Sequence, residues 1–279
     1  MRTFRVDLYE YFGIERLEGC QGYLTVYEHC EFQEFTKNRI RPAMLVIPGG
    51  GYGWCSEREA EPIAMQYLTQ GFNSYCLSYS VGEHAKYPTP VLEAVMAVLY
   101  IKQTADKSTT NPNKVCGVGF SAGGHLLGML VTAYNNKEIR DILGDCIDNA
   151  RLDGAIFSYA VILTENTHKG SIQNITGGDK TLIPTVDIVN NLNANSTPAF
   201  IWTTVEDGTV PCESSLELAR AYKRLGIPFE LHMFERGRHG LSIGTDEVNS
   251  PFPSIQPWVS LSLTWLRERD FVNTIKEKE

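Results

Sequence analysis

The sequence predicts an α/β fold in which a mostly parallel central sheet is covered by helices on both faces. Strand-like segments alternate with helix-like segments along most of the 279 residues, which is the pattern of βαβ crossovers. The inner strand candidates are continuous apolar runs, as expected for strands buried on both faces. A hydrophobic content of 43% is enough for a large core in one domain of this length.

The strand candidates differ in how much of each is exposed. Residues 22–30 alternate polar and apolar side chains, as in a strand with one face in solvent. Residues 43–51 are an apolar run that ends in glycines, which is typical of a central strand. In chain order we expect strands at residues 22–30, 43–51, 73–80, from 114 up to the glycine at 119, and at 152–162, 198–207 and 228–235.

The helix candidates lie between these strands and carry start and stop signals. Residues 89–106 are amphipathic with Pro90 in the first turn, and residues 57–71 end at a glycine. Both signals support helices that cross between parallel strands. In chain order we expect helices at residues 57–71, 89–106, directly after 121, and at 213–226 and 257–270.

Residues 164–197 do not follow this alternation, because they are rich in Asn, Thr and Gly with only short apolar patches. We interpret them as an insertion between two core strands that carries short helices over the substrate entrance. Long loops of this kind are often lids, and a solvated excursion without function is the alternative. The sequence shows no repeat or linker, so we predict one domain over residues 1–279 with a lid-like insertion at 164–197.

Composition and charge limit the classes of function. The net charge of −8 disfavours nucleic acid as a partner, because phosphates would be repelled. No apolar run approaches the ~18 residues of a membrane span, and the first residues contain no apolar core of a secretory signal. The seven cysteines are spread without CxxC pairs, which favours reduced thiols over disulfides or a zinc site. We therefore expect a cytoplasmic protein without a metal site.

The segment Gly119-Phe120-Ser121-Ala122-Gly123 lies where a strand candidate meets a helix candidate. A tight turn there leaves no room for side chains beside the serine, so glycines flank it. Such a turn holds the serine oxygen away from the backbone and is typical of a nucleophile elbow. The alternatives are a structural Gly-rich turn or a phosphate cradle. We predict that Ser121 is a catalytic nucleophile.

A serine hydroxyl needs a neighbouring base and a group that orients this base. Where an elbow carries the nucleophile, the acid and then the histidine follow it in the chain. His239 fits this order and lies in a loop after a strand, between two glycines, so we predict that it is the general base. The other five histidines precede the serine or the acid, or lie within a helix or a strand: His29, His84, His125, His168 and His232.

The acid is predicted at Asp207, where an apolar strand ends in Glu206-Asp207-Gly208. The carboxyl edge of an open α/β sheet is where such folds place their sites. Glu206 is the alternative acid, one residue earlier and expected to face the other way. An Asx turn, which Asp-Gly favours in any protein, is the structural alternative for Asp207.

Gly49, Gly50 and Gly51 follow a buried strand and can present bare backbone N–H groups. With the N–H of Ala122, just after the serine, they would form an oxyanion hole. A phosphate loop is the rival interpretation, but neither glycine cluster has the GxxxxGK[ST] pattern.

The residues after the three glycines are predicted to line the substrate pocket. Tyr52 and Trp54 are bulky aromatic residues near the proposed hole, and a place in the core is the alternative for both. Cys55 is not expected to be a nucleophile, because the sequence indicates no base for it.

Four motifs in this order, "VIPGGGYGWCSEREAEPIA", "GFSAGGHL", "EDGTVP" and "RGRHGL", resemble the α/β-hydrolase superfamily. Within it they are similar to the acetyl-esterase and acetylxylan-esterase-like branch, related to lipases and esterases with an HGGG oxyanion motif. The resemblance spans the chain from about Ala43 to the C-terminal helix. It implies a sheet of about eight strands, a Ser-His-Asp triad and no cofactor.

The resemblance can be carried over residue by residue. Ser121, Asp207 and His239 match the triad, and Gly50, Gly51 and Ala122 match the oxyanion residues. One position departs from the pattern, because Pro48 stands where the HGGG motif has its histidine. That histidine normally supports the loop, so the departure leaves open which N–H groups form the hole.

The function that the resemblance implies is a serine carboxylesterase. It would remove short acyl groups, acetyl first, from a small-molecule or oligosaccharide ester such as acetylated sugars or xylo-oligosaccharides. A prolyl-oligopeptidase-type peptidase shares the fold and triad but usually carries a large propeller domain, for which 279 residues leave no room. A non-catalytic, hydrolase-like binding protein is the third hypothesis, and labelling of Ser121 by a fluorophosphonate would exclude it.

Overall fold

The apolar segments predicted as strands form the centre of the molecule. The computed structural model describes residues 1–31, 34, 39–133 and 136–275. Within them, nine strands join one sheet in the order β1-β2-β4-β3-β5-β6-β7-β8, with β9 paired to β3. The strands are β1 (Arg2–Asp7), β2 (Tyr23–Glu28), β3 (Arg39–Ile47), β4 (Asn73–Ser78), β5 (Thr110–Phe120), β6 (Gly154–Ser158), β7 (Ala199–Thr204), β8 (Phe229–Phe234) and β9 (Thr274–Ile275).

The pairing of the strands agrees with the predicted, mostly parallel sheet. The pairs from β4 through β3, β5, β6 and β7 to β8 are parallel. In the part of the chain that the structure describes, the antiparallel pairs are β1–β2, β2–β4 and β3–β9. Parallel neighbours need a crossover, and helices supply it throughout this part of the chain.

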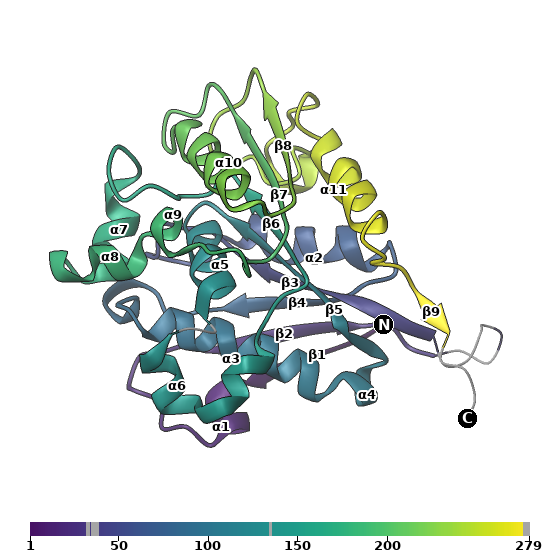
Figure 1. The fold of residues 1–279 in the computed structure, drawn as a ribbon. Helices are drawn as coiled ribbons and strands as arrows, with labels where there is room; N and C mark the ends of the chain where they lie inside the picture. The colour runs from purple at the N-terminus through teal and green to yellow at the C-terminus, as the bar shows by residue number, and fades with distance from the viewer. Residues whose placement is uncertain (32–33, 35–38, 134–135, 276–279) are drawn as a thin grey trace.

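Helices cover both faces of the sheet (Figure 1). The described residues form α1 (Leu8–Phe12), α2 (Glu61–Leu68), α3 (Thr89–Gln103), α4 (Ala105–Ser108), α5 (Ala122–Thr132), α6 (Lys137–Leu143), α7 (Lys169–Thr176), α8 (Ile183–Val186), α9 (Ile188–Asn191), α10 (Glu213–Leu225) and α11 (Pro257–Arg267). Short 3-10 helices include η1 (Glu57–Glu59) and η6 (Asp246–Val248). No described helix has the length and apolar content needed to cross a membrane.

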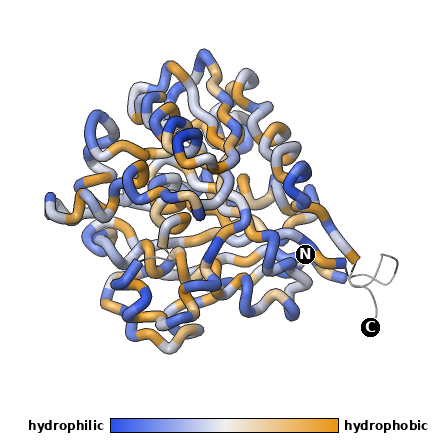
Figure 2. The backbone as a smooth tube through the Cα atoms, in the orientation of Figure 1, coloured by the Kyte–Doolittle hydropathy of each residue, from blue (hydrophilic) through white to orange (hydrophobic). Residues whose placement is uncertain are grey.

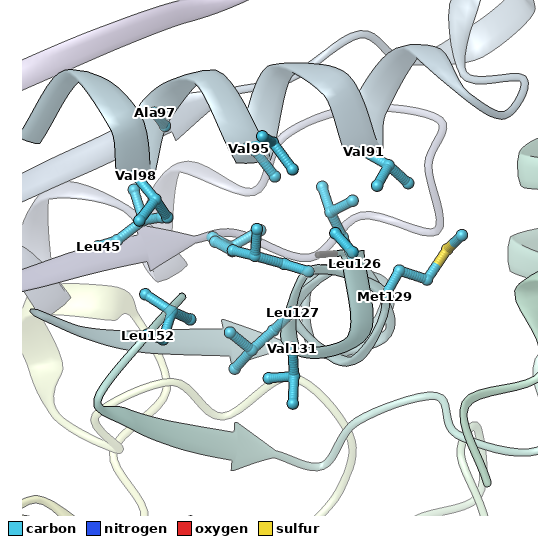
Figure 3. Close-up of a cluster of buried hydrophobic side chains, with 14 of the residues drawn as sticks. Leu45, Val91, Val95, Ala97, Val98, Leu126, Leu127, Met129, Val131 and Leu152 are labelled. Atoms are coloured by element: carbon cyan, nitrogen blue, oxygen red, sulfur yellow. The ribbon is translucent and has the colours of Figure 1, made fainter. Parts of the chain in front are cut away.

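The side chains on the two faces of β3 pack into two different hydrophobic clusters. Leu45 and Ile47 belong to the hydrophobic cluster under α3, α5 and α10, whereas Met44 and Val46 belong to the cluster under α2 and α11. Figure 3 shows part of the first cluster, where side chains of α3 such as Val95 lie close to Leu126 of α5 and Leu45 lies beside Val98 of α3. Burial on both faces explains why this strand is a continuous apolar run.

Along the outer helices, hydrophilic and hydrophobic stretches alternate, as Figure 2 shows. In α10 the buried residues include Leu218, Ala221 and Tyr222, at the spacing of one helix face. That face packs against the sheet, and the opposite face carries charged residues such as Lys223 and Arg224 in the last turn. The amphipathic pattern that predicted the helix is therefore confirmed.

Some elements were not predicted. β1 is exposed over its first four residues, so it has no apolar face from which a sequence pattern could be recognised. The short helices α1 and α6 also carried no prediction, and the helix expected at residues 89–106 divides into α3 and the start of α4. The elements that were predicted agree with the structure to within a few residues at their ends.

Residues 164–197 contain α7, η5 (Lys180–Leu182), α8 and α9. Their apolar side chains are few but buried: Ile172, Ile175, Val186 and Ile188 are at most 6% exposed. The short helices expected in this segment are present. Its role as a moving lid, and the division of the chain into one domain with an insertion, stay predictions.

A buried carboxylate at Glu93 in α3 predicts a pH-dependent stability. Its oxygens accept hydrogen bonds from Ser80 N at 2.6 Å and from the Tyr9 hydroxyl at 3.1 Å. Burial raises the pKa of Glu93 from 4.5 to about 7. The folded chain therefore holds this proton more tightly than the unfolded chain, and stability falls as the pH rises between these two values.

We expect Glu93→Gln to be more stabilising at pH 8 than at pH 5, because only the ionised carboxylate carries the burial penalty. The difference between the two pH values is expected to be about 2–3 kcal/mol in the free energy of unfolding. Urea denaturation of both proteins at both pH values measures it. Glu235→Gln, at a side chain that is 87% exposed, is the control, and an equal response of both variants would contradict the prediction.

Candidate active site

Ser121 lies at the turn between β5 and α5. Its backbone has φ +50° and ψ −117°, a conformation that residues other than glycine rarely adopt. Two hydrogen bonds hold the turn: Ser121 N–H donates to Ser158 O at 3.1 Å, and Val161 N–H donates to Ser121 O at 3.0 Å. The hydroxyl therefore stands at the carboxyl end of β5, in the geometry of a nucleophile elbow.

At the two glycines that flank the serine, Gly119 and Gly123, there is no room for a side chain. A Cβ at Gly123 would lie 2.2 Å from the carbonyl oxygen of Ile47, and a Cβ at Gly119 would lie 2.5 Å from the carbonyl oxygen of Gly123. Both obstacles are backbone atoms of β3 and α5, which cannot yield without moving the elements themselves. The GxSxG spacing thus lets the strand and helix approach closely enough to form the turn.

Three side chains predicted from the sequence meet at this turn. His239 Nε2 lies 2.8 Å from Ser121 Oγ, and His239 Nδ1 lies 2.7 Å from Asp207 Oδ2. A carboxylate can only accept, so Nδ1–H donates to Asp207 and Nε2 is free to accept the serine proton. The side chain of Asp207 is fully buried and that of His239 is 17% exposed. This arrangement can deprotonate a serine hydroxyl.

Asp207 follows β7 and uses its two oxygens for different tasks. Oδ1 accepts from the N–H groups of Thr209 and Val210, both at 2.9 Å, and Oδ2 accepts from His239. The Asx turn that was the structural alternative is therefore present, and it fixes the carboxylate that faces the histidine. Glu206, the alternative acid, accepts from Gly237 N–H at 3.2 Å instead.

His239 is held by the ring of Tyr159 as well as by Asp207. The Tyr159 ring meets the imidazole edge to face, with ring centroids 5.0 Å apart. The loop that carries the histidine is tied to β7, because the Thr204 hydroxyl donates to Gly237 O at 2.7 Å. These contacts fix the orientation of the imidazole.

The glycine loop lies beside the elbow, where a Cβ on Gly49 would come within 3.0 Å of Ser121 Cβ. Gly50 has φ +120° and Gly51 φ +64°, so both adopt backbone conformations that favour glycine. In the described part of the chain, no hydrogen bond to another protein group uses the N–H of Gly50, Gly51 or Ala122. These N–H groups are therefore available as donors, and their role as an oxyanion hole stays a prediction.

Pro48 occupies the position of the motif histidine, and other residues hold the loop. The Tyr79 hydroxyl donates to Pro48 O at 2.7 Å, and Gly49 N–H donates to Glu59 Oε2 at 2.9 Å. Since Gly49 N–H is engaged by Glu59, it is not available as an oxyanion donor. Sequence reasoning missed Glu59 and Tyr79, because no local pattern marks contacts between residues that are 10 and 31 positions apart.

The insertion at residues 164–197 also contacts the glycine loop. Asn174 of α7 donates through its side-chain amide to Gly51 O at 2.9 Å. The ring of His168, which precedes α7, lies close to Gly51, since a Cβ built on that glycine would be 3.2 Å from it. The ring also forms a hydrogen bond with the Ser171 hydroxyl. Residues 164–197 thus help to hold the loop in place.

His125 is a structural residue, as predicted. Burial lowers its pKa to about 4, so the ring is neutral. Nε2–H donates to Val186 O at 2.9 Å, which leaves Nδ1 to accept from the Tyr52 hydroxyl at 2.8 Å. The ring therefore joins α5 to α8 and does not reach Ser121.

The prediction that Tyr52 lines the pocket is wrong. Its side chain is 0% exposed and its hydroxyl is bonded to His125, so it belongs to the core, which was the alternative considered. Trp54 is 65% exposed and remains a pocket candidate. Burial raises the pKa of the Cys55 thiol to about 12, which agrees with the expectation that it is not a nucleophile.

A groove lies beside the glycine loop, with Pro48 and Trp54 among its lining residues. It combines aromatic, charged and amide side chains, and among its lining residues are Tyr27, Trp54, Arg58, Glu61, Glu247 and Asn249. In the described residues, no group of three His, Cys, Asp or Glu side chains is placed to hold a metal ion.

The chain matches known proteins over most of its length. A family model described as BD-FAE matches residues 32–222. The chain is 37% identical over 221 residues to endo-1,4-beta-xylanase B of Butyrivibrio fibrisolvens, which covers 75% of this chain and 34% of the xylanase. It is 28% identical over 212 residues to an acetylxylan esterase of Xylanibacter ruminicola, with 73% of this chain and 42% of that protein covered.

One of the similar solved structures is the acetyl ester-xyloside bifunctional hydrolase from Caldicellulosiruptor lactoaceticus. It superposes with a TM-score of 0.76 at 30% identity, covering 90% of this chain and 89% of that one. The neighbours confirm the predicted α/β-hydrolase fold. The chain spans less than half the length of the curated xylanase and esterase.

Proposed function

This chain belongs to the BD-FAE family, and from that premise we propose that it is a serine carboxylesterase that removes short acyl groups. The observation that carries the proposal is a pair of hydrogen bonds made by His239, one to Ser121 at 2.8 Å and one to Asp207 at 2.7 Å. A nucleophile, a base and an orienting acid in this arrangement are the requirements of acyl transfer through a covalent intermediate.

In the first half of the reaction, His239 Nε2 takes the proton of Ser121 as Oγ attacks the ester carbonyl. The carbonyl oxygen becomes an anion, and the N–H groups of Gly50, Gly51 and Ala122 donate to it. Ala122 is the first residue of α5, so the helix dipole also favours negative charge there. Collapse of this intermediate breaks the ester bond, and His239 gives its proton to the leaving alcohol.

In the second half, water replaces the alcohol. His239 takes a proton from the water as its oxygen attacks the acyl-enzyme, and the same N–H groups stabilise the second oxyanion. The proton then returns to Ser121, which releases the acid product. Asp207 stabilises the charged imidazole in both halves and is not itself protonated.

For the substrate, we propose acetyl esters of sugars or xylo-oligosaccharides. Two similar proteins are named acetylxylan esterase and acetyl ester-xyloside bifunctional hydrolase. The groove beside the glycine loop presents the exposed face of Trp54 together with Arg58 and Asn249. An aromatic face with hydrogen-bonding side chains around it suits a sugar ring, which has both apolar C–H faces and hydroxyl groups.

Trp54→Ala is expected to weaken the use of an oligosaccharide substrate selectively. Covering part of the exposed Trp54 ring with a sugar contributes about 1–2 kcal/mol. Its loss corresponds to a rise in KM of about 5–30-fold for acetylated xylo-oligosaccharides. For p-nitrophenyl acetate, which does not reach along the groove, kcat/KM is expected to change less than about 3-fold. Initial-rate kinetics with both substrates measure the two effects.

Tyr11→Ala is the matched control, because Tyr11 is an exposed aromatic residue on α1 (43% exposed) outside the groove. Its kinetics are expected to equal those of the unmodified chain with both substrates. A Trp54→Ala variant that loses activity equally on both substrates would contradict a sugar contact at Trp54.

The esterase proposal is tested with p-nitrophenyl esters of increasing acyl length and with a fluorophosphonate probe. We expect the highest kcat/KM for acetate and covalent labelling of Ser121 by the probe. A chain that hydrolyses none of the esters and leaves Ser121 unlabelled would support the non-catalytic hypothesis instead.

A further inference from the structure

Glu59 is a buried carboxylate that is not part of the triad. It is the last residue of η1 and only 2% exposed. Its Oε2 accepts from Gly49 N–H at 2.9 Å, and its Oε1 accepts from the Tyr159 hydroxyl at 2.6 Å. None of the ion pairs in the described ranges of the chain involves Glu59. Burying an acid among neutral donors lowers stability, so a buried glutamate here indicates that its two hydrogen bonds serve the neighbouring loops.

Tyr159 continues the connection from Glu59 toward the histidine. Its hydroxyl donates to Glu59 and accepts from Ser242 N–H at 3.0 Å, three residues after His239. Its ring also packs against the imidazole of His239. Burial and the Glu59 carboxylate raise the pKa of Tyr159 well above its usual value, so the hydroxyl stays protonated and keeps donating.

These contacts form one buried connection between two loops that are far apart in sequence. It runs from Gly49 N–H to Glu59, then to the Tyr159 hydroxyl, and ends at Ser242 N–H. The Ser242 hydroxyl closes the connection on the other side, because it donates to the carbonyl oxygen of Arg58, the neighbour of Glu59. The glycine loop and the histidine loop are thereby joined through side chains outside the triad.

We propose that Glu59 and Tyr159 are positioning residues that hold the glycine loop and the His239 loop at a fixed separation for the transition state. This inference rests on the proposed esterase function. Glu59 bonds to Gly49, directly before the two N–H groups assigned to the oxyanion. Tyr159 contacts His239, which transfers the proton. The pair thus couples the position of the oxyanion donors to the position of the base.

Glu59→Gln is expected to separate positioning from substrate binding. Gly49 N–H and the Tyr159 hydroxyl bond to different oxygens of Glu59. In glutamine one of these two positions becomes an NH₂ group, which cannot accept, so one of the two contacts is lost in its present form. A misplaced oxyanion donor acts mainly on the transition state, so kcat for p-nitrophenyl acetate is expected to fall about 10–100-fold while KM changes less than about 3-fold. The inhibition constant of a trifluoromethyl ketone, which adds to Ser121 and forms an oxyanion, is expected to rise by the same factor as kcat/KM falls.

Tyr159→Phe is the second variant, because it keeps the ring against His239 and removes only the hydroxyl. We expect kcat to fall about 10-fold, and the double variant to be no slower than Glu59→Gln alone, since both changes break one connection. Glu93→Gln is the matched control: it alters another buried carboxylate that accepts from a backbone N–H and a tyrosine, and its kcat is expected to be unchanged.

The outcomes distinguish this inference from the proposed function. If Glu59→Gln and Tyr159→Phe lower only the melting temperature and keep kcat and ketone affinity, the inference is overturned while the esterase proposal stands. If Glu59→Gln does not fold, Tyr159→Phe decides, and an unchanged kcat overturns the inference. Absence of Ser121-dependent hydrolysis in the unmodified chain overturns both.

Discussion

Ser121→Ala is expected to lower kcat for p-nitrophenyl acetate by at least about 10⁴-fold, because acyl transfer then has no nucleophile. What remains would come from the oxyanion donors acting on direct attack by water. The fold is expected to persist, since alanine keeps the Cβ and the backbone hydrogen bonds of Ser121 to Ser158 and Val161. Steady-state kinetics and thermal unfolding of the purified variant measure both effects.

Ser214→Ala is the control for this prediction. Ser214 is also buried, and its hydroxyl has no hydrogen-bond partner within the described residues. Its removal is expected to leave kcat unchanged. If Ser121→Ala instead retained activity close to that of the unmodified chain, the hydrolysis would not use the elbow serine, and the assignment of the nucleophile would have to be abandoned.

The sequence predicts the inner sheet well, because strands buried on both faces must be apolar throughout. β3, β5 and β7 therefore stand out as apolar runs, and the helices between them show an amphipathic pattern. β1 is different, since among the described residues it is an edge strand that pairs with β2 alone, and it exposes most of its residues. Its pairing comes from tertiary contacts, which a local pattern does not record.

The proposed triad can be predicted from sequence motifs, whereas the residues that hold it in place cannot. A nucleophile elbow and the chain order of acid and histidine identify Ser121, Asp207 and His239 without knowledge of any distance. Glu59 and Tyr159 are 100 positions apart, and only the fold brings them together beneath the glycine loop. Glutamate is usually exposed and tyrosine is found both in cores and near surfaces, so neither residue type indicates from the sequence alone that these two side chains meet in the interior.

Tyr52 was assigned to the substrate pocket because it is adjacent in sequence to the glycine loop, and this inference was wrong. It follows the glycine loop directly, yet its φ is +60° and its side chain points into the core toward His125. A positive φ changes the direction of the side chain relative to its neighbours, and nothing in the local pattern predicts it for a tyrosine. Trp54, two residues later, is the aromatic residue that reaches solvent.

Asp207→Asn is expected to lower kcat by about 10³–10⁴-fold while the fold persists. The amide oxygen of asparagine can still accept from Thr209 and Val210, which preserves the turn. Its NH₂ group would then face His239 Nδ1, and two donors cannot bond. The imidazole would shift its proton to Nε2, the nitrogen that must accept from Ser121, so the base is lost although every residue stays in place.

Glu206→Gln makes the same carboxylate-to-amide change at the neighbouring residue, and it tests whether Glu206 could be the acid instead. Glu206 accepts from Gly237 N–H, and the amide oxygen of glutamine can replace that contact, so kcat is expected to change less than about 3-fold. Measuring kcat and the melting temperature of both variants separates an effect on the base from an effect on the loop. A larger loss of kcat in Glu206→Gln than in Asp207→Asn would contradict the assignment of Asp207 as the acid and would assign that role to Glu206. The acid is the residue that fixes the tautomer of His239, so catalysis requires both its charge and its accepting oxygen.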